Sequence, residues 1–350
     1  MASAEKTHSV RALLKFVVIP ALLLILLCHI GGFFLGWYFS GTDFGSYVRL
    51  VFPNHRGKGS PRINGKVALE YAQKNYDLGP KVFRTEGAMR SAEWILREAK
   101  NIKWLEKAGG KRRIVTNMTG DPPPVVCNVE IAFPGPTDDF VVIGAHHDTK
   151  LLFDVPDFAG ANDGASGVGA LLAMAAETAY YAQKKPLPCG IRFVFFDGEE
   201  ALYQYTDTDG LVGSRVYVDS LRRDGSLKNC RAMVLLDMIG DKDLDFEIAG
   251  NSTPALDALT MEAVRALGHE KKVNTRECRD MIDDHVPFLQ AGIPALDLID
   301  FNYGPDNSYW HTKEDTMDKI SADSIKTAAD VAFRVVWILA ENGFADLERK

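Results

Sequence analysis

Two adjacent carboxylates, Glu199 and Glu200, follow a short apolar run and an Asp-Gly pair. The run, residues 191–196, is bulky and apolar apart from Arg192, and its β-branched and aromatic residues predict a buried strand. Ligands of open α/β sheets bind just beyond the carboxyl ends of the strands. Adjacent carboxylates on a turn can point in different directions, so one can hold a metal ion while the other transfers protons. A Glu-Glu pair alone is more often a solvated turn, and the other strand ends therefore decide the interpretation.

Side chains of the same chemical kinds occur at the other predicted strand ends and in the loops. They are His146, Asp148, Asp163, Asp237, Asp283 and His311. Imidazole and carboxylate ligands together suit zinc, and no cysteine is required. Each residue alone has an ordinary explanation, such as capping of a turn by Asp237 or of a helix by Asp163. The joint argument is stronger, because all of these groups fall at the same edge of one predicted sheet.

Three of the side chains, Asp163, Glu200 and His311, can hold one zinc ion and leave the fourth position open to substrate. This is the coordination pattern of a catalytic site rather than a structural one. A second metal ion could share Asp163 and add His146 and Asp237. The residue types alone leave open whether one ion binds or two.

The two remaining acids at these strand ends have different predicted roles. Asp148, two residues beyond His146, is placed to hydrogen-bond a metal ligand rather than the metal itself. Glu199 is then the free carboxylate, available for proton transfer.

Alternating strands and helices position these residues. Strands are predicted at residues 125–133, 140–145, 191–196, 232–236 and 295–299, and helices at 84–100, 168–182, 254–267 and 322–341, with shorter ones after 213 and around 288. This alternation predicts an α/β fold with a mostly parallel, mixed central sheet and helices on both faces.

The amino-terminal part has a different composition. Residues 16–39 are apolar almost throughout and long enough to cross a bilayer as a helix. Lys6, Arg11 and Lys15 precede this stretch, which predicts a cytoplasmic tail (1–15), a single-pass anchor (16–39), a linker (40–64) and an extracytoplasmic catalytic domain (65–350). A cleaved signal peptide is the alternative, although the run is long for one and no clear cleavage site follows.

Overall composition excludes little beyond nucleic-acid binding. The chain has 350 residues and a formal net charge of −7, with no basic patch suited to nucleic acid. Its 5 cysteines are scattered without metal-type spacing. One disulfide is possible in an extracytoplasmic domain, and none can be assigned.

Several of these motifs occur together and in order. They are His-x-Asp (146–148), Gly-Ala-Asn-Asp-Gly-Ala-Ser-Gly (160–167), Phe-Phe-Asp-Gly-Glu-Glu-Ala (195–201), Gly-Ser-Arg (213–215), Leu-Leu-Asp-Met-Ile-Gly (235–240) and Trp-His-Thr (310–312). The set resembles the zinc aminopeptidase superfamily, peptidase family M28, over roughly residues 65–345. Within it, Asp-Asp-His-Val-Pro-Phe at 283–288 is similar to the glutaminyl cyclases, because aminopeptidases usually have a single Asp before that His.

The resemblance implies cyclisation of an amino-terminal glutamine of a peptide or protein to pyroglutamate, with one zinc ion expected. It implies that Glu199, Asp237 and Asp283 are catalytic, with Asp237 and Asp283 sharing a proton. Asp284 and His285 would contact the catalytic residues and metal ligands without binding the metal or the substrate themselves. Trp310, Tyr205 and Met281 would line the substrate pocket.

Two features depart from the animal cyclases. Tyr205 stands where those enzymes have a tryptophan, and Ala145 and Val168 stand where they have a disulfide pair. Two other functions remain open at this point. One is a two-zinc aminopeptidase that hydrolyses amino-terminal residues from peptides, and the other is a non-catalytic ectodomain, which the retained polar residues argue against.

Overall fold

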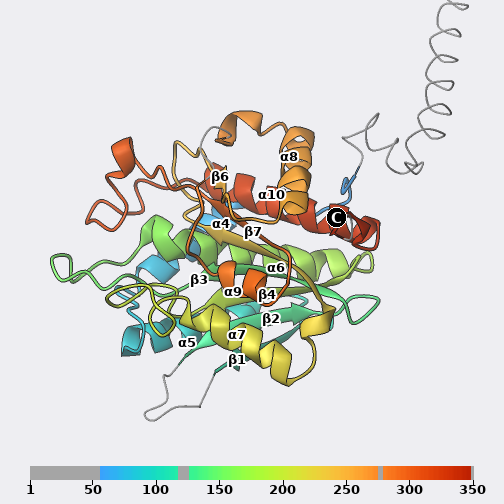
Figure 1. Cartoon of the computed structure of the whole chain (residues 1–350), viewed down its shortest axis with the longest axis horizontal. Helices are drawn as coiled ribbons and strands as arrows, with labels where there is room; N and C mark the ends of the chain where they lie inside the picture. Colours follow the sequence, from blue (N-terminus) through green and yellow to red (C-terminus); the bar gives the residue numbers. More distant parts are fainter. Residues whose placement is uncertain (1–55, 117–125, 275–278, 348–350) are drawn as a thin grey trace, which may run out of the picture. The chain divides into compact units, whose positions relative to one another are not determined.

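The computed structural model describes residues 56–116, 126–274 and 279–347, and its central feature is a mixed seven-stranded sheet (Figure 1). The strand order is β1-β2-β4-β3-β5-β7-β6. The strands are β1 (Lys111–Val115), β2 (Asn128–Phe133), β3 (Phe140–His146), β4 (Gly190–Phe196), β5 (Cys230–Asp237), β6 (Glu247–Ile248) and β7 (Ala295–Ile299). β4, β3, β5 and β7 are parallel neighbours, and β1, β2 and β6 pair antiparallel at the two edges.

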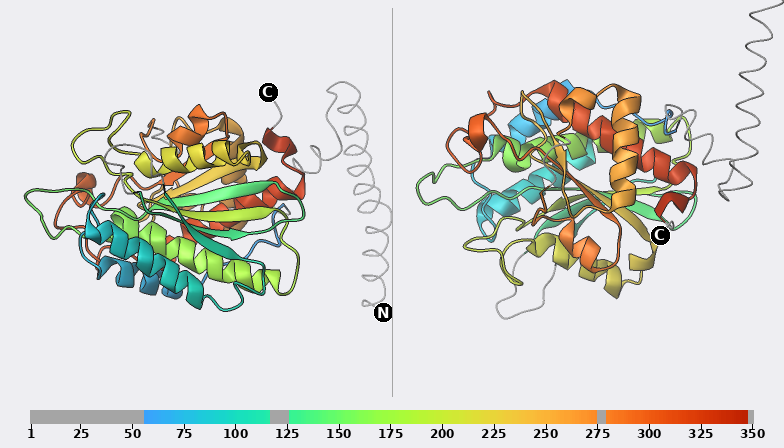
Figure 2. Two further views of the ribbon diagram at one scale, coloured as in Figure 1. Left: turned by 90° about the horizontal axis from the view of Figure 1, so that it is seen from below. Right: turned by 45° about the horizontal axis from the view of Figure 1, so that its top comes forward.

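Helices cover both faces of the sheet (Figure 2). One face packs against α4 (Gly65–Tyr76), α5 (Glu86–Asn101), α6 (Gly167–Ala182), α8 (Pro254–Leu267) and α10 (Ala322–Glu341). The other face packs against α7 (Val212–Arg223) and α9 (Val286–Gln290). Both layers are apolar because alternate residues of each central strand face opposite ways: Ile143 of β3 belongs to the first core and Val142 to the second.

The predicted α/β class is confirmed, and so are the five predicted strands and the six predicted helices. The sequence analysis missed α4, β1 and β6. The edge strand β1 has the sequence Lys-Arg-Arg-Ile-Val and is mostly exposed, so it lacks the apolar alternation that signals a strand. In α4, the buried apolar residues are the small Ala68 and Ala72, which give a weak periodic signal.

The packed unit begins at Arg56, within the stretch predicted as a linker. Arg56 forms ion pairs with Glu262 and Asp346, and Ile63 is buried in the first core. The predicted anchor, residues 16–39, lies outside the described residues. Within the described ranges, none of the helices combines the length and apolar character needed to span a bilayer.

The carboxyl ends of β3, β4, β5 and β7 meet at one edge of the sheet. His146 and Asp237 are the last residues of β3 and β5, and Glu199 and Glu200 follow β4 closely. Parallel pairing of β3 with both β4 and β5 therefore brings residues from distant parts of the sequence together, as predicted.

Candidate metal and catalytic site

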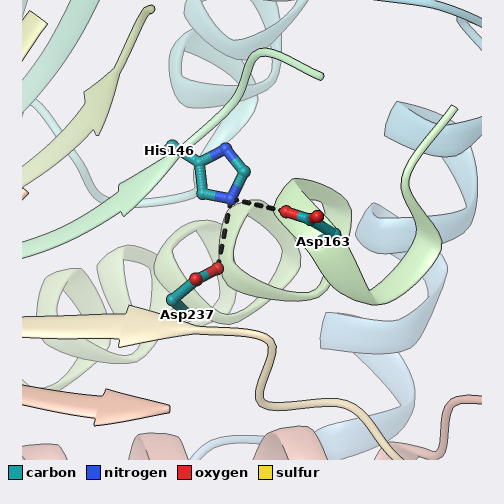
Figure 3. A group of neighbouring side chains, drawn as sticks. All are labelled: His146, Asp163 and Asp237. Atoms are coloured by element: carbon teal, nitrogen blue, oxygen red, sulfur yellow. Dashed lines mark hydrogen bonds and ion pairs between the residues drawn. The ribbon is translucent and has the colours of Figure 1, made fainter. Parts of the chain in front are cut away.

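His146 connects the ends of two strands. Its Nε2 lies 3.1 Å from Oδ1 of Asp237, at the end of β5, and 3.1 Å from Oδ1 of Asp163 (Figure 3). Its Nδ1 lies 3.7 Å from Asp148, whose two carboxylate oxygens accept the backbone N–H groups of Glu199 and Glu200 at 3.1 and 3.2 Å. Asp148 thus supports the β3 and β4 ends together, consistent with its predicted supporting role.

Asp163 is presented by a π-helical turn, Ala161–Ser166, at the start of α6. The turn departs from helical geometry at Asp163 (ψ 89°) and at Gly164, whose φ of +102° favours glycine. Asp315 fixes this turn from outside, because its carboxylate accepts the N–H groups of Asn162 and Asp163 at 2.8 and 3.2 Å. The hydroxyl of Tyr303 donates to the same carboxylate at 2.7 Å.

Asp163 belongs to two groups of side chains that can hold a metal ion. One group is His146, Asp163 and Asp237, and the other is Asp163, Glu200 and His311. In each group the candidate ligand atoms lie within 4.8 Å of one another. In the second group, Nε2 of His311 is 2.8 Å from Oε1 of Glu200 and 3.1 Å from Oδ2 of Asp163. The structure brings together both ligand sets that the sequence predicted.

The electrostatics of this region fit a cation. Burial alone would raise the pKa of Asp163, but hydrogen bonds from His146 and His311 outweigh burial and hold that pKa well below its usual range. Burial would lower the pKa of His311, but its hydrogen bonds to Asp163 and Glu200 raise the pKa to about 10. The buried carboxylates therefore favour a positive charge at this place, and together with the imidazoles they form a set of ligand atoms suited to a divalent ion.

A cavity of about 240 Å³ opens beside the second group. Its wall includes Asp163, Glu200 and His311, whereas His146 does not line it. The other residues of the wall are Glu199, Tyr205, Asp237, Met238, Met281, Ile282, Asp283, Ile299, Phe301 and Trp310. All three residues of the second group therefore line the cavity in which a substrate could bind.

Glu199 lies in this cavity with its carboxylate free of both ligand sets. Burial and the neighbouring Glu200 raise the pKa of Glu199 well above its usual value. Its Oε1 accepts a hydrogen bond from the hydroxyl of Tyr205 at 3.0 Å. Asp209 anchors the loop that carries Tyr205 by accepting the N–H groups of residues 202–204 at 2.7 to 3.1 Å. A buried carboxylate with a raised pKa is suited to proton transfer near neutral pH.

Asp283 lies in the same cavity, and its pKa is raised well above the usual value, first by burial and then by Asp297 and Asp237. Its Oδ1 accepts the N–H of Asp284 at 2.6 Å. The sequence analysis expected Asp237 to share a proton with Asp283, and in the structure Oδ1 of Asp237 contacts His146. The negative charge of Asp237 contributes to the raised pKa of Asp283, and the sharing of a proton between the two carboxyl groups stays a prediction.

Asp284 and His285 lie behind this wall. Burial raises the pKa of Asp284 to about 7, while burial lowers that of His285 to about 4. Nδ1 of His285 lies 3.6 Å from Asp297 on β7. Both residues lie outside the two ligand sets, as expected for a supporting role.

Aromatic and thioether side chains form the apolar side of the cavity. The indole of Trp310 stacks on His311 with ring centroids 4.1 Å apart and an interplanar angle of 22°, and it packs against Phe301 at 4.9 Å. Met281 is held by Asn251, which bonds both its N–H and its carbonyl oxygen, at 3.0 and 2.9 Å. The three predicted pocket residues, Trp310, Tyr205 and Met281, all line the cavity.

The sequence analysis missed several supporting residues. Asp315 had no signal, because its role depends on a turn formed about 150 residues earlier in the chain. Lys81 is fully buried and donates from Nζ to the carbonyl oxygen of Ala159 at 2.7 Å, just before the turn that presents Asp163. Burial lowers the pKa of Lys81 to about 7. A lone lysine or aspartate outside any strand end carries no sequence pattern that predicts such a contact.

Residues 128–336 match the family described as peptidase family M28. The chain belongs to this family. A glutaminyl cyclase from an Acidobacteriales bacterium is 32% identical and superposes with a TM-score of 0.71, over 82% of this chain and 98% of that one. Together with the sequence relatives, this places the chain in the glutaminyl cyclase branch of the M28 family.

Two further proteins that are similar to this chain differ in their named activities. Glutaminyl-peptide cyclotransferase of Drosophila melanogaster is 27% identical over 270 residues, which make up 69% of this chain and 72% of the relative. A Zn-dependent exopeptidase of Parabacteroides distasonis is 25% identical with a TM-score of 0.63, over 79% of this chain and 99% of that one. The chain is thus similar both to a cyclase and to a zinc exopeptidase.

Proposed function

We propose that the protein is a zinc-dependent glutaminyl-peptide cyclotransferase, which converts amino-terminal glutamine to pyroglutamate and releases ammonia. The main support for this proposal is the cavity in which Glu199 lies beside Asp163, Glu200 and His311. At about 240 Å³ the cavity is smaller than the pockets of roughly 300–1,000 Å³ that take drug-sized ligands. It therefore suits a single terminal residue, and the cyclase relatives support glutamine as that residue.

One zinc ion held by Asp163, Glu200 and His311 fits the donor set best. These three residues face the cavity together, whereas the other group includes His146, which does not line it. Zinc bound there would supply a Lewis acid to polarise the side-chain amide of the substrate. The binding of a second ion by His146, Asp163 and Asp237 is not required for cyclisation, because no activated water takes part.

In the proposed reaction, the α-amine nitrogen of the substrate attacks the side-chain amide carbon of the same residue. A new carbon–nitrogen bond closes the five-membered ring, and the bond to the amide nitrogen breaks. Both groups belong to one residue, so correct positioning gives a large rate advantage. Glu199 accepts a proton from the amine and returns it to the departing nitrogen, which leaves as ammonia.

The neighbours of Glu199 hold it and the substrate in place. Tyr205 donates to Glu199, and the protonated carboxyl that the raised pKa of Asp283 favours can donate a hydrogen bond to the substrate. Trp310 supplies an apolar wall against the side-chain methylenes. The tyrosine at 205 thus provides a polar contact at a position where animal cyclases have an indole.

A two-zinc aminopeptidase is the second candidate, and a specific observation favours it: the complete His146–Asp163–Asp237 group. In that enzyme Glu199 would deprotonate a water molecule, and the products would be a free amino acid and a shortened peptide.

Incubation with two peptides separates the candidates. One peptide begins with glutamine and the other with leucine, and both are otherwise identical. The cyclase proposal predicts ammonia and a blocked amino terminus from the first peptide, with no reaction of the second. Release of free leucine at a comparable rate, with two zinc ions per chain, would favour the aminopeptidase.

We also propose that residues 16–39 anchor the chain in a membrane, with a cytoplasmic amino terminus and the catalytic domain outside the cytoplasm. The apolar run and the preceding Lys6, Arg11 and Lys15 support this. On fractionation, the full-length chain should remain with the membranes. Protease added outside intact cells should degrade the catalytic domain. A mature protein that starts near residue 42 would show a cleaved signal instead.

A further inference from the structure

A strongly basic surface occurs at the end of α5, in the following loop and at the start of β1. Residues 97–113 contain seven basic and two acidic residues, in a chain whose net charge is −7. We call the following residues the basic edge: Lys100, Lys103, Trp104, Lys107, Lys111 and Arg112. All but the half-buried Arg112 are exposed. The catalytic site makes no use of this surface.

Trp104 gives the basic edge an apolar centre. Its side chain is 39% exposed, and Nζ of Lys103 and Lys107 lie 4.8 and 5.2 Å from its ring centroid. Its backbone has φ +76°, a left-handed conformation that is rare for a bulky residue. The loop thus holds a large aromatic ring at the surface close to two cations. Ile114 on β1 is also exposed, and it lines the same surface hollow as Lys100, Lys111 and Arg112.

The basic edge and the cavity lie at opposite ends of the parallel strands. Lys111 pairs with Ala132, and Ala132 pairs with Arg192, near the beginning of β4. The loop before Lys111 therefore lies at the amino ends of the parallel strands, while the cavity lies at their carboxyl ends. A flat partner bound to the basic edge leaves the cavity accessible.

The start of the packed unit lies at this same side. Arg56 pairs with Asp346, and nearby Phe344 lies under the guanidinium of Arg231, the second residue of β5. The segment at 344–346 and Arg56, which pairs with it, are thus also at the amino ends of the strands. Arg56, the first described residue of the unit, is therefore at the same end of the strands as the basic edge.

We propose that the basic edge binds the anionic phospholipid headgroups of a bilayer surface. Lysines attract anionic headgroups, and an exposed indole is suited to the interface between headgroups and acyl chains. Each lysine near an anionic membrane strengthens partitioning by a factor of roughly five. Binding in this way directs the cavity away from the bilayer. The interaction requires no catalysis, so its test is independent of the proposed reaction.

The test uses the full-length chain with nanodiscs of phosphatidylcholine alone or mixed with phosphatidylglycerol. Backbone hydrogen exchange is followed in peptides that cover residues 100–115. We expect exchange to be slower by about fivefold or more with the anionic lipid at low salt. High salt should remove the difference, because it screens exposed charges.

Two charge-reversal variants make the test specific. The K103E/K107E variant should lose the protection. The K242E/K271E variant, with the same change in charge, should keep it, because these exposed lysines follow β5 and α8 toward the carboxyl ends of the strands. Unchanged exchange in β3 and α6 shows that each variant is folded.

Three results would overturn the proposal. The first is equal exchange of residues 100–115 with both lipids. The second is protection that survives K103E/K107E. The third is equal protection by heparin without lipid, which would assign the surface to a soluble anionic polymer instead of a bilayer.

Discussion

The hydroxyl of Tyr205 lies 3.0 Å from Oε1 of Glu199 and donates a hydrogen bond to it. This bond stabilises the ionised carboxylate, which burial and Glu200 disfavour. Tyr205→Phe should therefore raise the pKa of Glu199 further. Because the proposed base must be ionised, the acidic limb of the kcat–pH profile should move to higher pH, by about one unit. Tyr203→Phe, at an exposed tyrosine of the same loop, should leave the profile unchanged.

Glu199→Gln keeps the shape of the side chain and removes the proton acceptor. Cyclisation should fall by about 10²–10⁴-fold, while the zinc content of the purified protein stays the same. Ammonia release and metal analysis measure the two quantities. Loss of zinc from this variant would mean that the roles of Glu199 and Glu200 are exchanged.

Alanine at each histidine distinguishes the two metal-capable groups. His311→Ala removes a proposed ligand and should abolish zinc binding. His146→Ala should keep one zinc ion and weaken its binding by about 10–100-fold, since His146 only supports the ligand Asp163. Equilibrium dialysis of both variants gives the comparison. Zinc retained by His311→Ala and lost by His146→Ala would place the ion in the other group.

The carboxylate of Asp315 should determine how well Asp163 is presented. Asp315→Asn replaces one of the two oxygens that accept the N–H groups of Asn162 and Asp163 with an amide donor. Zinc affinity should fall by about 10–100-fold, as for other residues that orient a metal ligand. Asp318→Asn, at an exposed acid of the same segment, is the matched control and should bind zinc normally.

Lys81 should make stability depend on pH above neutrality. Burial lowers its pKa from 10.5 to about 7, so between these values the unfolded chain binds a proton that the native chain does not. The free energy of unfolding should therefore rise with pH in this interval, by up to about 1.4 kcal/mol per pH unit. Below about pH 7 Lys81 is protonated in both states, so this dependence on pH disappears.

Urea unfolding at several pH values between 7 and 9 measures this slope. Lys81→Met should show a smaller slope than the unsubstituted chain, because it removes the titrating group. Lys271→Met, at an exposed lysine, should retain the full slope. Equal slopes for the Lys81→Met variant and the unsubstituted chain would show that Lys81 is charged in the native protein.

The sequence was sufficient for the residues that follow buried strands. Glu200 and Asp237 were predictable because an apolar run predicts each of the two strands, and the carboxyl ends of parallel strands lie at one edge of the sheet. His311 lies in a loop, and its assignment depended on its chemical type and on the Trp-His-Thr motif. The catalytic edge therefore follows from pattern and topology together.

The supporting contacts were beyond prediction for physical reasons. Asp315 and Lys81 act through backbone groups of a distant turn, and any residue can provide those backbone groups. The contact between Asp237 and His146 depends on side-chain direction at the strand end, which the residue types do not determine. The basic edge was missed because its cations come from a helix end, a loop and an edge strand that itself had no pattern.

Asp163 directs Oδ1 toward His146 and Oδ2 toward His311, so the two metal-capable groups are joined through one carboxylate. In evolutionary terms, a one-ion and a two-ion enzyme can then share every ligand residue. We expect cyclisation and hydrolysis to differ in how Asp237 is held and charged. The informative positions lie beside the ligands, and substitutions at residues such as Asp283 should mark where related chains changed their chemistry.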